Sequence, residues 1–263
     1  MIARRYDLVQ SKREVLAVVG KGGTGKTTLV AIMAKVLVAT RKVKLLVVDA
    51  DPPVSLTYAL GAKPVNTIGE IRRKLIEDPQ EKRRIGDKHI RDVILDEAII
   101  DSNGISLIVM GRAEGPGCFC SINELLRFGI GSLSKRFDIT LIDCEAGIEQ
   151  VNRRVIKAIN TLVMISDATI RGIQTAAYLR KIAQDYGVQK PHRTVLVINK
   201  TKKETEQIKE KAQEMGLKIF GFIPEDENII RYDLIGKPII DLPDTSPSVI
   251  AVREILKNLG LMT

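Results

Sequence analysis

Short, unbroken runs of aliphatic residues alternate with stretches of helical periodicity along most of the chain. Within these runs Val, Ile and Leu follow one another without polar alternation, which is typical of parallel strands covered on both faces. The runs predict strands at residues 14–20, 43–51, 104–112, 137–145, 161–167, 194–200 and 218–224.

Helical stretches separate these strands. The most regular are residues 25–41, 170–187 and 203–216, and the last two end on a Gly that suits a helix C-cap. Strands that alternate with helices indicate βαβ units. The pattern therefore predicts an α/β fold with one doubly wound, mostly parallel sheet flanked by helices.

Residues 1–263 are interpreted as a single domain, because no linker, repeat or low-complexity segment interrupts the pattern. Residues 62–103 are the most charged and the least strand-like, and we interpret them as a charged helical insertion. Residues 246–263 form an amphipathic pattern whose apolar face we expect to cover the sheet.

Composition favours a globular protein of the cytoplasm. Hydrophobic residues make up 44% of the chain, whereas aromatic residues make up 4%, so the core is expected to be aliphatic. Three cysteines do not make a disulfide framework. We expect neither a secretory signal nor a membrane span. The net charge of +9 is spread over short basic groups, and a solvated surface is preferred over a patch for an acidic protein, nucleotide or DNA.

The segment "GKGGTGKTT" (20–28) follows a predicted strand and opens a predicted helix, which is the context that a phosphate-binding loop requires. Its glycines allow backbone N–H groups to point at phosphate oxygens, and the helix N-terminus favours an anion. Lys26 is expected at the β- and γ-phosphates and the Thr27 hydroxyl at Mg²⁺. The expected phosphate-binding residues are Gly20, Gly22, Gly23, Thr24, Gly25, Lys26, Thr27 and Thr28.

The additional lysine, Lys21, makes this segment resemble the deviant Walker A motif of the superfamily of MinD, ParA and the nitrogenase iron protein. The resemblance covers about residues 14 to 260. It implies an ATPase that binds ATP or ADP with Mg²⁺ and forms a homodimer with the nucleotides between its subunits. It also implies that Lys21 crosses to the phosphates of the partner, which ties hydrolysis to dimerisation.

Further segments resemble that superfamily. In "VVDADP" (47–52) the resemblance implies that Asp51 orients the attacking water and that Asp49 supports the Mg²⁺ shell. In "LIDCEAG" (141–147) it implies that Asp143 faces Mg²⁺ through water and that Gly147 lies near the γ-phosphate. Carboxylates at the ends of strands lie where open α/β sheets bind ligands.

The contacts to the nucleotide base are also expected from the resemblance. "VINK" (197–200) places Asn199, followed by Lys200, where the superfamily reads adenine. "FIPED" (222–226) places Pro224 and Glu225 in the second loop that contacts the base.

Two of the three cysteines lie one residue apart in "GPGCFC" (115–120). Neighbouring positions do not meet the geometry of a relaxed disulfide, and two thiolates are half of a closed four-ligand site. Residues 110–127 resemble the Cys-X-Cys segment of the CooC-type accessory ATPases of carbon monoxide dehydrogenase, which are nickel-insertion factors. "AGIEQ" (146–150) resembles the same group.

This second resemblance implies a site shared across the two-fold axis of a dimer. Cys118 and Cys120 of each subunit would supply four thiolates to Ni²⁺ or Zn²⁺. It also implies a client nickel enzyme, either a carbon monoxide dehydrogenase or an acetyl-CoA synthase. We expect neither a membrane nor a nucleic acid among the partners.

Three alternatives stay open. Cys144, directly after Asp143, suggests the alternative of an iron–sulfur redox ATPase of the nitrogenase-iron-protein type. A lone cysteine at a strand end is, however, more typical of a small buried residue. A DNA-partitioning ATPase would use the positive charge, and a membrane-associated regulator would use the C-terminal helix. His89 and His192 do not lie at ligand spacing from a cysteine.

Overall fold

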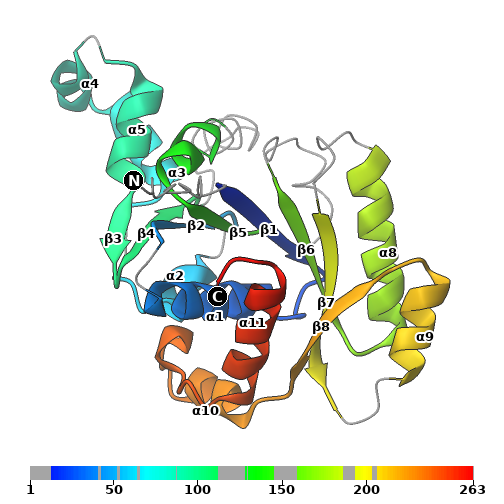
Figure 1. The fold of residues 1–263 in the computed structure, drawn as a ribbon. Helices are drawn as coiled ribbons and strands as arrows, with labels where there is room; N and C mark the ends of the chain where they lie inside the picture. Colours follow the sequence, from blue (N-terminus) through cyan, green and yellow to red (C-terminus); the bar gives the residue numbers. More distant parts are fainter. Residues whose placement is uncertain are drawn as a thin grey trace, which may run out of the picture.

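The computed structural model describes residues 13–40, 43–51, 54–63, 66–86, 88–111, 128, 130–144, 159–185, 193–202 and 206–262. Its centre is an eight-stranded sheet with the order β3-β4-β2-β5-β1-β6-β7-β8 (Figure 1). The strands are β1 (Glu14–Gly20), β2 (Leu45–Asp49), β3 (Ile100–Ser102), β4 (Ile105–Val109), β5 (Ile139–Asp143), β6 (Thr161–Asp167), β7 (Arg193–Thr201) and β8 (Ile219–Pro224). Six of the seven strand pairs are parallel, and β3 with β4 is antiparallel. The predicted fold class is confirmed.

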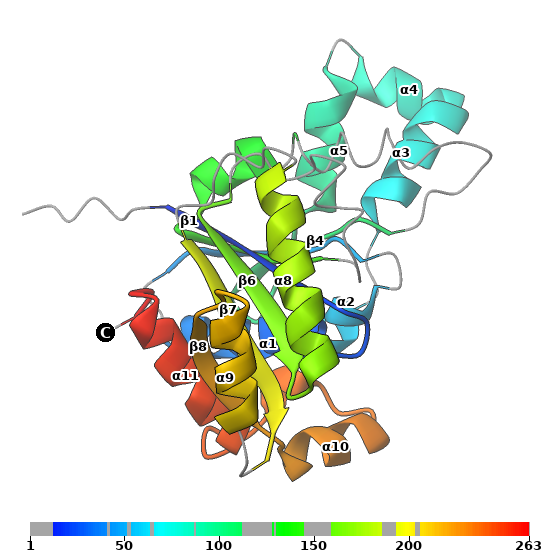
Figure 2. The same ribbon diagram turned by 90° about the vertical axis from the view of Figure 1, so that its right-hand side faces the viewer.

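Each strand contributes to two apolar layers, because successive side chains point to opposite faces of the sheet. In β1, Val15, Ala17 and Val19 belong to one core cluster and Leu16 and Val18 to the other. Helices cover both layers, as Figures 1 and 2 show. One side carries α1 (Lys26–Ala39), α2 (Ser55–Ala59), α10 (Glu227–Leu234) and α11 (Pro247–Asn258), and the other carries α3 (Ile68–Glu77), α4 (Pro79–Ile85), α5 (Ile90–Ala98), α8 (Ile170–Asp185) and α9 (Glu206–Glu214).

Helix α1 connects the end of β1 to the core. Its sequence, "KTTLVAIMAKVLVA", is apolar on nearly every side, which is typical of a buried helix. It packs between the sheet and α11, so its N-terminus is held at the centre of the sheet edge. The preceding residue, Gly25, has a left-handed conformation with φ 93°, which starts the helix without a side-chain cap.

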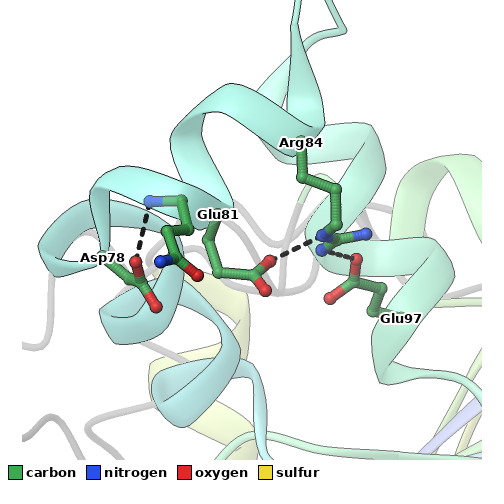
Figure 3. A network of polar contacts seen from close by, with 5 residues as sticks. Asp78, Glu81, Arg84 and Glu97 are labelled. Carbon is green, nitrogen blue, oxygen red and sulfur yellow. Dashed lines mark hydrogen bonds and ion pairs between the residues drawn. The ribbon is translucent and has the colours of Figure 1, made fainter.

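The charged stretch 62–103 contains three helices that extend away from the sheet (Figure 2). Helix α3 begins at a capping box, in which the Thr67 hydroxyl accepts from the Glu70 N–H and the Glu70 carboxylate accepts from the Thr67 N–H. In Figure 3, Asp78 caps α4, and Arg84 of α4 donates to Glu81 and to Glu97 of α5. Polar contacts therefore join the outer helices.

Strand β3 differs from the helical interpretation of this stretch. Asn103 and Gly104 both have positive φ, 53° and 78°, and form a two-residue connection between β3 and β4. An Asn-Gly pair is a strong signal for such a hairpin, because both residues tolerate the left-handed conformation. Helices α2 and α10 were also not predicted. In the described part of the chain, no helix is both long enough and apolar enough to cross a bilayer.

Candidate functional site

The candidate site lies at the edge of the sheet where the parallel strands end. Parallel strands bring their carboxyl ends to one edge, and ligands of open α/β sheets bind outside that edge. Gly20, Asp49 and Asp143 end β1, β2 and β5. β6 and β7 run beside them in register, with Asp167 opposite Asn199.

The loop between β1 and α1 folds around the carbonyl of Lys21. The N–H and hydroxyl of Thr24 donate to this oxygen at 3.3 Å and 2.8 Å, and the Lys26 Nζ lies 3.5 Å from it. Lys26 is buried, whereas the side chain of Lys21 is exposed. The two lysines of the motif therefore occupy different environments, one inside the loop and one at the surface.

Two glycines of this loop are required by close contacts. A Cβ at Gly20 would lie 2.4 Å from the carbonyl oxygen of Ile165 in β6. A Cβ at Gly25 would lie 2.5 Å from the Nδ2 of Asn199, and Gly25 also has positive φ. The loop is thus packed directly against β6 and β7, and a side chain at either position would displace it.

Asp49 and Asp143 face each other on adjacent strands, where they are register partners and fully buried. The Thr27 hydroxyl donates to Oδ2 of Asp143 at 2.6 Å. Oδ1 of Asp143 is buried and has no hydrogen-bond partner in the described part of the chain. An unpartnered buried carboxylate oxygen beside a Thr hydroxyl fits a hydrated divalent cation, because hard cations prefer oxygen ligands.

Burial raises the pKa of both carboxyl groups. The pKa of Asp49 rises to about 7, first through burial and then through the charge of Asp143. The pKa of Asp143 rises to about 6 through burial, although the Thr27 hydroxyl and the charge of Lys26 oppose this shift. Burial also raises the pKa of Asp51, against the charge of Lys26. Burial thus disfavours the charged forms of these carboxyl groups, and a bound cation would favour them.

Asp49 has a second role that its sequence position did not reveal. Its two oxygens accept from the N–H groups of Asp51 and Leu56, each at 3.2 Å. The carboxylate therefore holds the backbone that leads into α2.

Helix α2 also places Ser55 Oγ 3.4 Å from Thr27 Oγ1. Ser55 was missed because the chain offers no motif that links it to residue 27.

Asn199 and Lys200, two of the predicted base-contacting residues, contact the loop between β1 and α1 from β7. The Asn199 amide donates to the carbonyl of Thr24 at 2.8 Å, and Lys200 Nζ donates to the carbonyl of Gly23 at 3.0 Å. Lys200 itself has φ 55°, a left-handed conformation that is uncommon for its residue type. β7 therefore supports the phosphate loop directly, in addition to the role that was predicted for Asn199.

Pro224 ends β8 at the same edge of the sheet, and Glu225 follows it. The Glu225 N–H donates to the carbonyl of Thr201 at 3.2 Å, and its carboxylate lies 3.7 Å from Lys202 Nζ. The ends of β7 and β8 are thus joined next to the phosphate loop. This arrangement brings the two predicted base-contacting segments together.

Cys118, Cys120 and Gly147 lie outside the described residues, as does His192. Among the residues that the structure describes, no group of three or more His, Cys, Asp and Glu side chains is arranged to hold a metal ion. Cys144 is 1% exposed and packs in one of the two core clusters. Burial raises the pKa of its thiol, which is the behaviour of a buried structural cysteine.

Comparison with known proteins agrees with this geometry. The model of the CobQ/CobB/MinD/ParA nucleotide binding domain matches residues 15–239. An uncharacterised ATP-binding protein of Methanocaldococcus jannaschii is 36% identical over 252 residues, 93% of this chain and 98% of that protein. The carbon monoxide dehydrogenase accessory protein CooC of Rhodospirillum rubrum is 33% identical over 189 residues, 66% of this chain and 70% of CooC.

Solved structures show the same fold. A ParA family ATPase from Chlorobium tepidum superposes with a TM-score of 0.72 at 21% identity, covering 96% of this chain and 100% of that one. The septum site-determining protein MinD of Pyrococcus horikoshii, solved with Mg-ADP, superposes with a TM-score of 0.68 at 20% identity, covering 94% and 95%. With its sheet order, its phosphate loop and the matched residues 15–239, the chain belongs to the CobQ/CobB/MinD/ParA nucleotide-binding domain family.

Proposed function

We propose that this protein is a Mg²⁺-dependent ATPase that acts as a homodimer and inserts nickel into a client enzyme, a carbon monoxide dehydrogenase or an acetyl-CoA synthase. The observation that carries the ATPase is the phosphate loop beside Asp143, whose Oδ1 is buried without a described partner. The family of the chain is one of nucleotide-binding ATPases. The nickel role is supported by the similarity to CooC and by the Cys118–Cys120 pair.

The residues of the site have complementary tasks in this proposal. Lys26 and the N–H groups of the loop bind the phosphates of ATP. Thr27 and, through water, Asp143 hold Mg²⁺, and Asp49 supports the Mg²⁺ shell; the ion would neutralise charge on the β- and γ-phosphates. Asp51, half-buried at the same edge, orients the attacking water. The loop backbone needs little rearrangement, because Asn199 and Lys200 already support it.

The exposed side chain of Lys21 supports a role between subunits. A cation that reaches the phosphates of a second subunit stabilises the transferred phosphoryl group after the two chains have met. Hydrolysis would thereby depend on dimerisation, and the state of the nucleotide would control whether Cys118 and Cys120 of the two subunits come together. ATP turnover would then open and close a metal site that two subunits share.

Measuring phosphate release from ATP tests the proposed ATPase activity. The wild-type protein is expected to release phosphate with Mg²⁺ and to lose this activity in EDTA. Asp51→Asn should keep ATP affinity within about threefold and lower turnover by about 100-fold, the usual contribution of a positioned base. Lys26→Ala serves as the control for contaminating ATPases. Equal turnover in the wild type and Lys26→Ala would refute the ATPase.

Bound metal per chain tests the nickel role. Protein purified without oxygen and incubated with Ni²⁺ is expected to hold about one ion per two chains, the stoichiometry of a four-thiolate site shared by a dimer. Cys118→Ser and Cys120→Ser should each abolish it, whereas Cys144→Ser is the matched control and should retain it. Loss in Cys144→Ser, or iron and labile sulfide in the wild type, would favour the iron–sulfur redox class instead.

The net charge of +9 favours a second candidate, a positioning ATPase of the ParA type that binds DNA. Binding of a nonspecific DNA duplex in the presence of ATP distinguishes the two. A ParA-type protein would bind with an affinity that falls steeply with salt, because phosphate contacts release counterions. A nickel-insertion factor is expected to bind the duplex weakly, with no dependence on ATP.

A further inference from the structure

Asp226 follows Pro224 and Glu225 directly, and its carboxylate joins the N-termini of two helices. Oδ1 accepts from the N–H of Asn228 at 3.0 Å, which caps α10. Oδ2 accepts from the N–H of Ser248 at 3.0 Å and from its hydroxyl at 2.5 Å, in the first turn of α11. Residues 226 and 248 thus fix the relative position of two helices that are separate in the sequence.

The segment around Asp226 is held from a second side by β7. The Thr201 hydroxyl donates to the carbonyl of Ile223, and the Thr201 carbonyl accepts from the Glu225 N–H. The Asn228 amide also donates to Ser246 Oγ, just before α11 begins. Pro224 and Glu225 therefore lie between two anchors, β7 on one side and the capped helices on the other.

Asp226 is not placed to contact a nucleotide itself. Its side chain is buried, with the residue 5% exposed, and both oxygens are engaged by α10 and α11. Burial alone would raise its pKa, but hydrogen bonds from the Ser248 hydroxyl and N–H, the Asn228 N–H and the Ser246 hydroxyl hold the pKa below its ordinary value. The group is therefore a charged acceptor whose partners all belong to the protein.

We propose that Asp226 is a positioning residue for base recognition, which holds Pro224 and Glu225 in place by capping α10 and tying it to α11. The inference rests on the proposed nucleotide binding and adds to it. It makes α11, the C-terminal helix, a part of the base site through the bonds between Asp226 and Ser248. Loss of Asp226 should therefore weaken contacts to the base and leave contacts to the phosphates intact.

Two probes separate these contacts. ATP engages both the phosphate loop and the base loop, whereas inorganic tripolyphosphate engages the phosphate loop alone. Dissociation constants for both, measured by calorimetry with Mg²⁺, are compared in the wild type and in Asp226→Ala. We expect ATP affinity to fall by about 5- to 20-fold, the range for loss of a helix cap and its hydrogen bonds, while tripolyphosphate affinity stays within twofold.

Two further variants control for damage to the fold. Asp244→Ala removes an acid whose Oδ1 lies 3.4 Å from Lys35 of α1 and 3.7 Å from Arg253 of α11, so it perturbs the docking of the same helix without touching the base loop. It should leave both affinities unchanged. Ser248→Ala keeps the backbone donor to Asp226, and it is expected to weaken ATP binding by about threefold.

The outcomes separate this inference from the proposed function. Wild-type protein that binds neither probe would overturn both. Wild-type protein that binds both probes, with Asp226→Ala unchanged for ATP or equally weakened for ATP and tripolyphosphate, would overturn the role of Asp226 alone. Melting curves check that each variant is folded. If Asp226→Ala does not fold, Ser248→Ala decides, and an unchanged ratio of the two affinities in that variant would overturn the inference.

Discussion

Asp49 and Asp143 end neighbouring strands, yet the oxygens of their carboxylates have different hydrogen-bond partners. Both oxygens of Asp49 accept backbone N–H groups, whereas Asp143 has one oxygen bound by Thr27 and one without a described partner. At the scale of the residue, the sequence motifs located both aspartates at the site. They did not separate the two roles, because the division depends on the backbone conformation between residues 49 and 56.

The carboxyl pair predicts a pH dependence of the unliganded protein. The folded-state pKa of Asp49 is about 7 and that of Asp143 about 6, both above the ordinary value of 3.8, so the folded state binds protons more tightly than the unfolded state. Stability should therefore fall as pH rises from about 4 to 7. Thermal melts without Mg²⁺ or nucleotide measure it. Asp49→Asn should make the melting temperature less dependent on pH between pH 6 and 7. An unchanged pH dependence in that range would contradict the argument that burial raises the pKa of Asp49.

Gly25 gives a prediction for nucleotide binding. Gly25→Ala places a Cβ 2.5 Å from Asn199 Nδ2 in a left-handed conformation, so it should destabilise the protein by about 2 kcal/mol and weaken ATP binding by more than about 10-fold. Gly86→Ala is the matched control, because Gly86 has φ 57° but nothing within 4 Å of an added Cβ. It should show the conformational cost alone, with normal ATP binding. Equal ATP affinity in both variants would contradict the packing argument.

At the scale of the element, the aliphatic runs predicted the strands well. β1 and β6 coincide with the predicted ranges, and the other predicted strands are each shorter or longer by a few residues at their ends. The hairpin of β3 was missed because the charge of its surroundings favoured a helix, although Asn103 and Gly104 carried the turn signal. Asn199 was placed at the site, but its contact with Thr24, 175 residues away in sequence, has no local signal.

The capping box of α3 gives a prediction for stability. Thr67→Ala removes the hydroxyl that accepts from the Glu70 N–H, and it should lower the free energy of unfolding by about 1 kcal/mol. Thr175→Ala is the control, because its hydroxyl donates to the Arg171 carbonyl in the middle of α8, where Ala is the better helix former. Urea denaturation of both variants measures the difference. A Thr67→Ala protein as stable as Thr175→Ala would show that the cap contributes little.

At the scale of the whole molecule, the order of the strands brings the predicted segments to one edge. The alternation of strands and helices indicated a doubly wound sheet, and parallel strands have their carboxyl ends at the same edge. The order itself, with β1 between β5 and β6, does not follow from hydrophobicity, because the hydrophobic residues of all three strands are buried. The strand order was therefore not predicted.

The proposed dimer gives a prediction at this scale. Lys21 is exposed and Lys26 is buried, so Lys21→Ala should bind ATP within about fivefold of the wild type but fail to dimerise with it. Lys26→Ala should fail to bind ATP. Sedimentation velocity with and without ATP distinguishes the two. A Lys21→Ala protein that dimerises with ATP and hydrolyses it at the wild-type rate would remove the role of Lys21 between subunits.

The hydrogen bond from Asn199 to Thr24 has a consequence for how the protein is made. The phosphate loop is synthesised early, but its support arrives with β7, 175 residues later. Contacts so distant in sequence form slowly, because a long chain must close before they are made. A nascent chain that ends before β7 carries the complete loop sequence without its support. ATP would therefore begin to stabilise the protein late in translation, after β7 has left the ribosome.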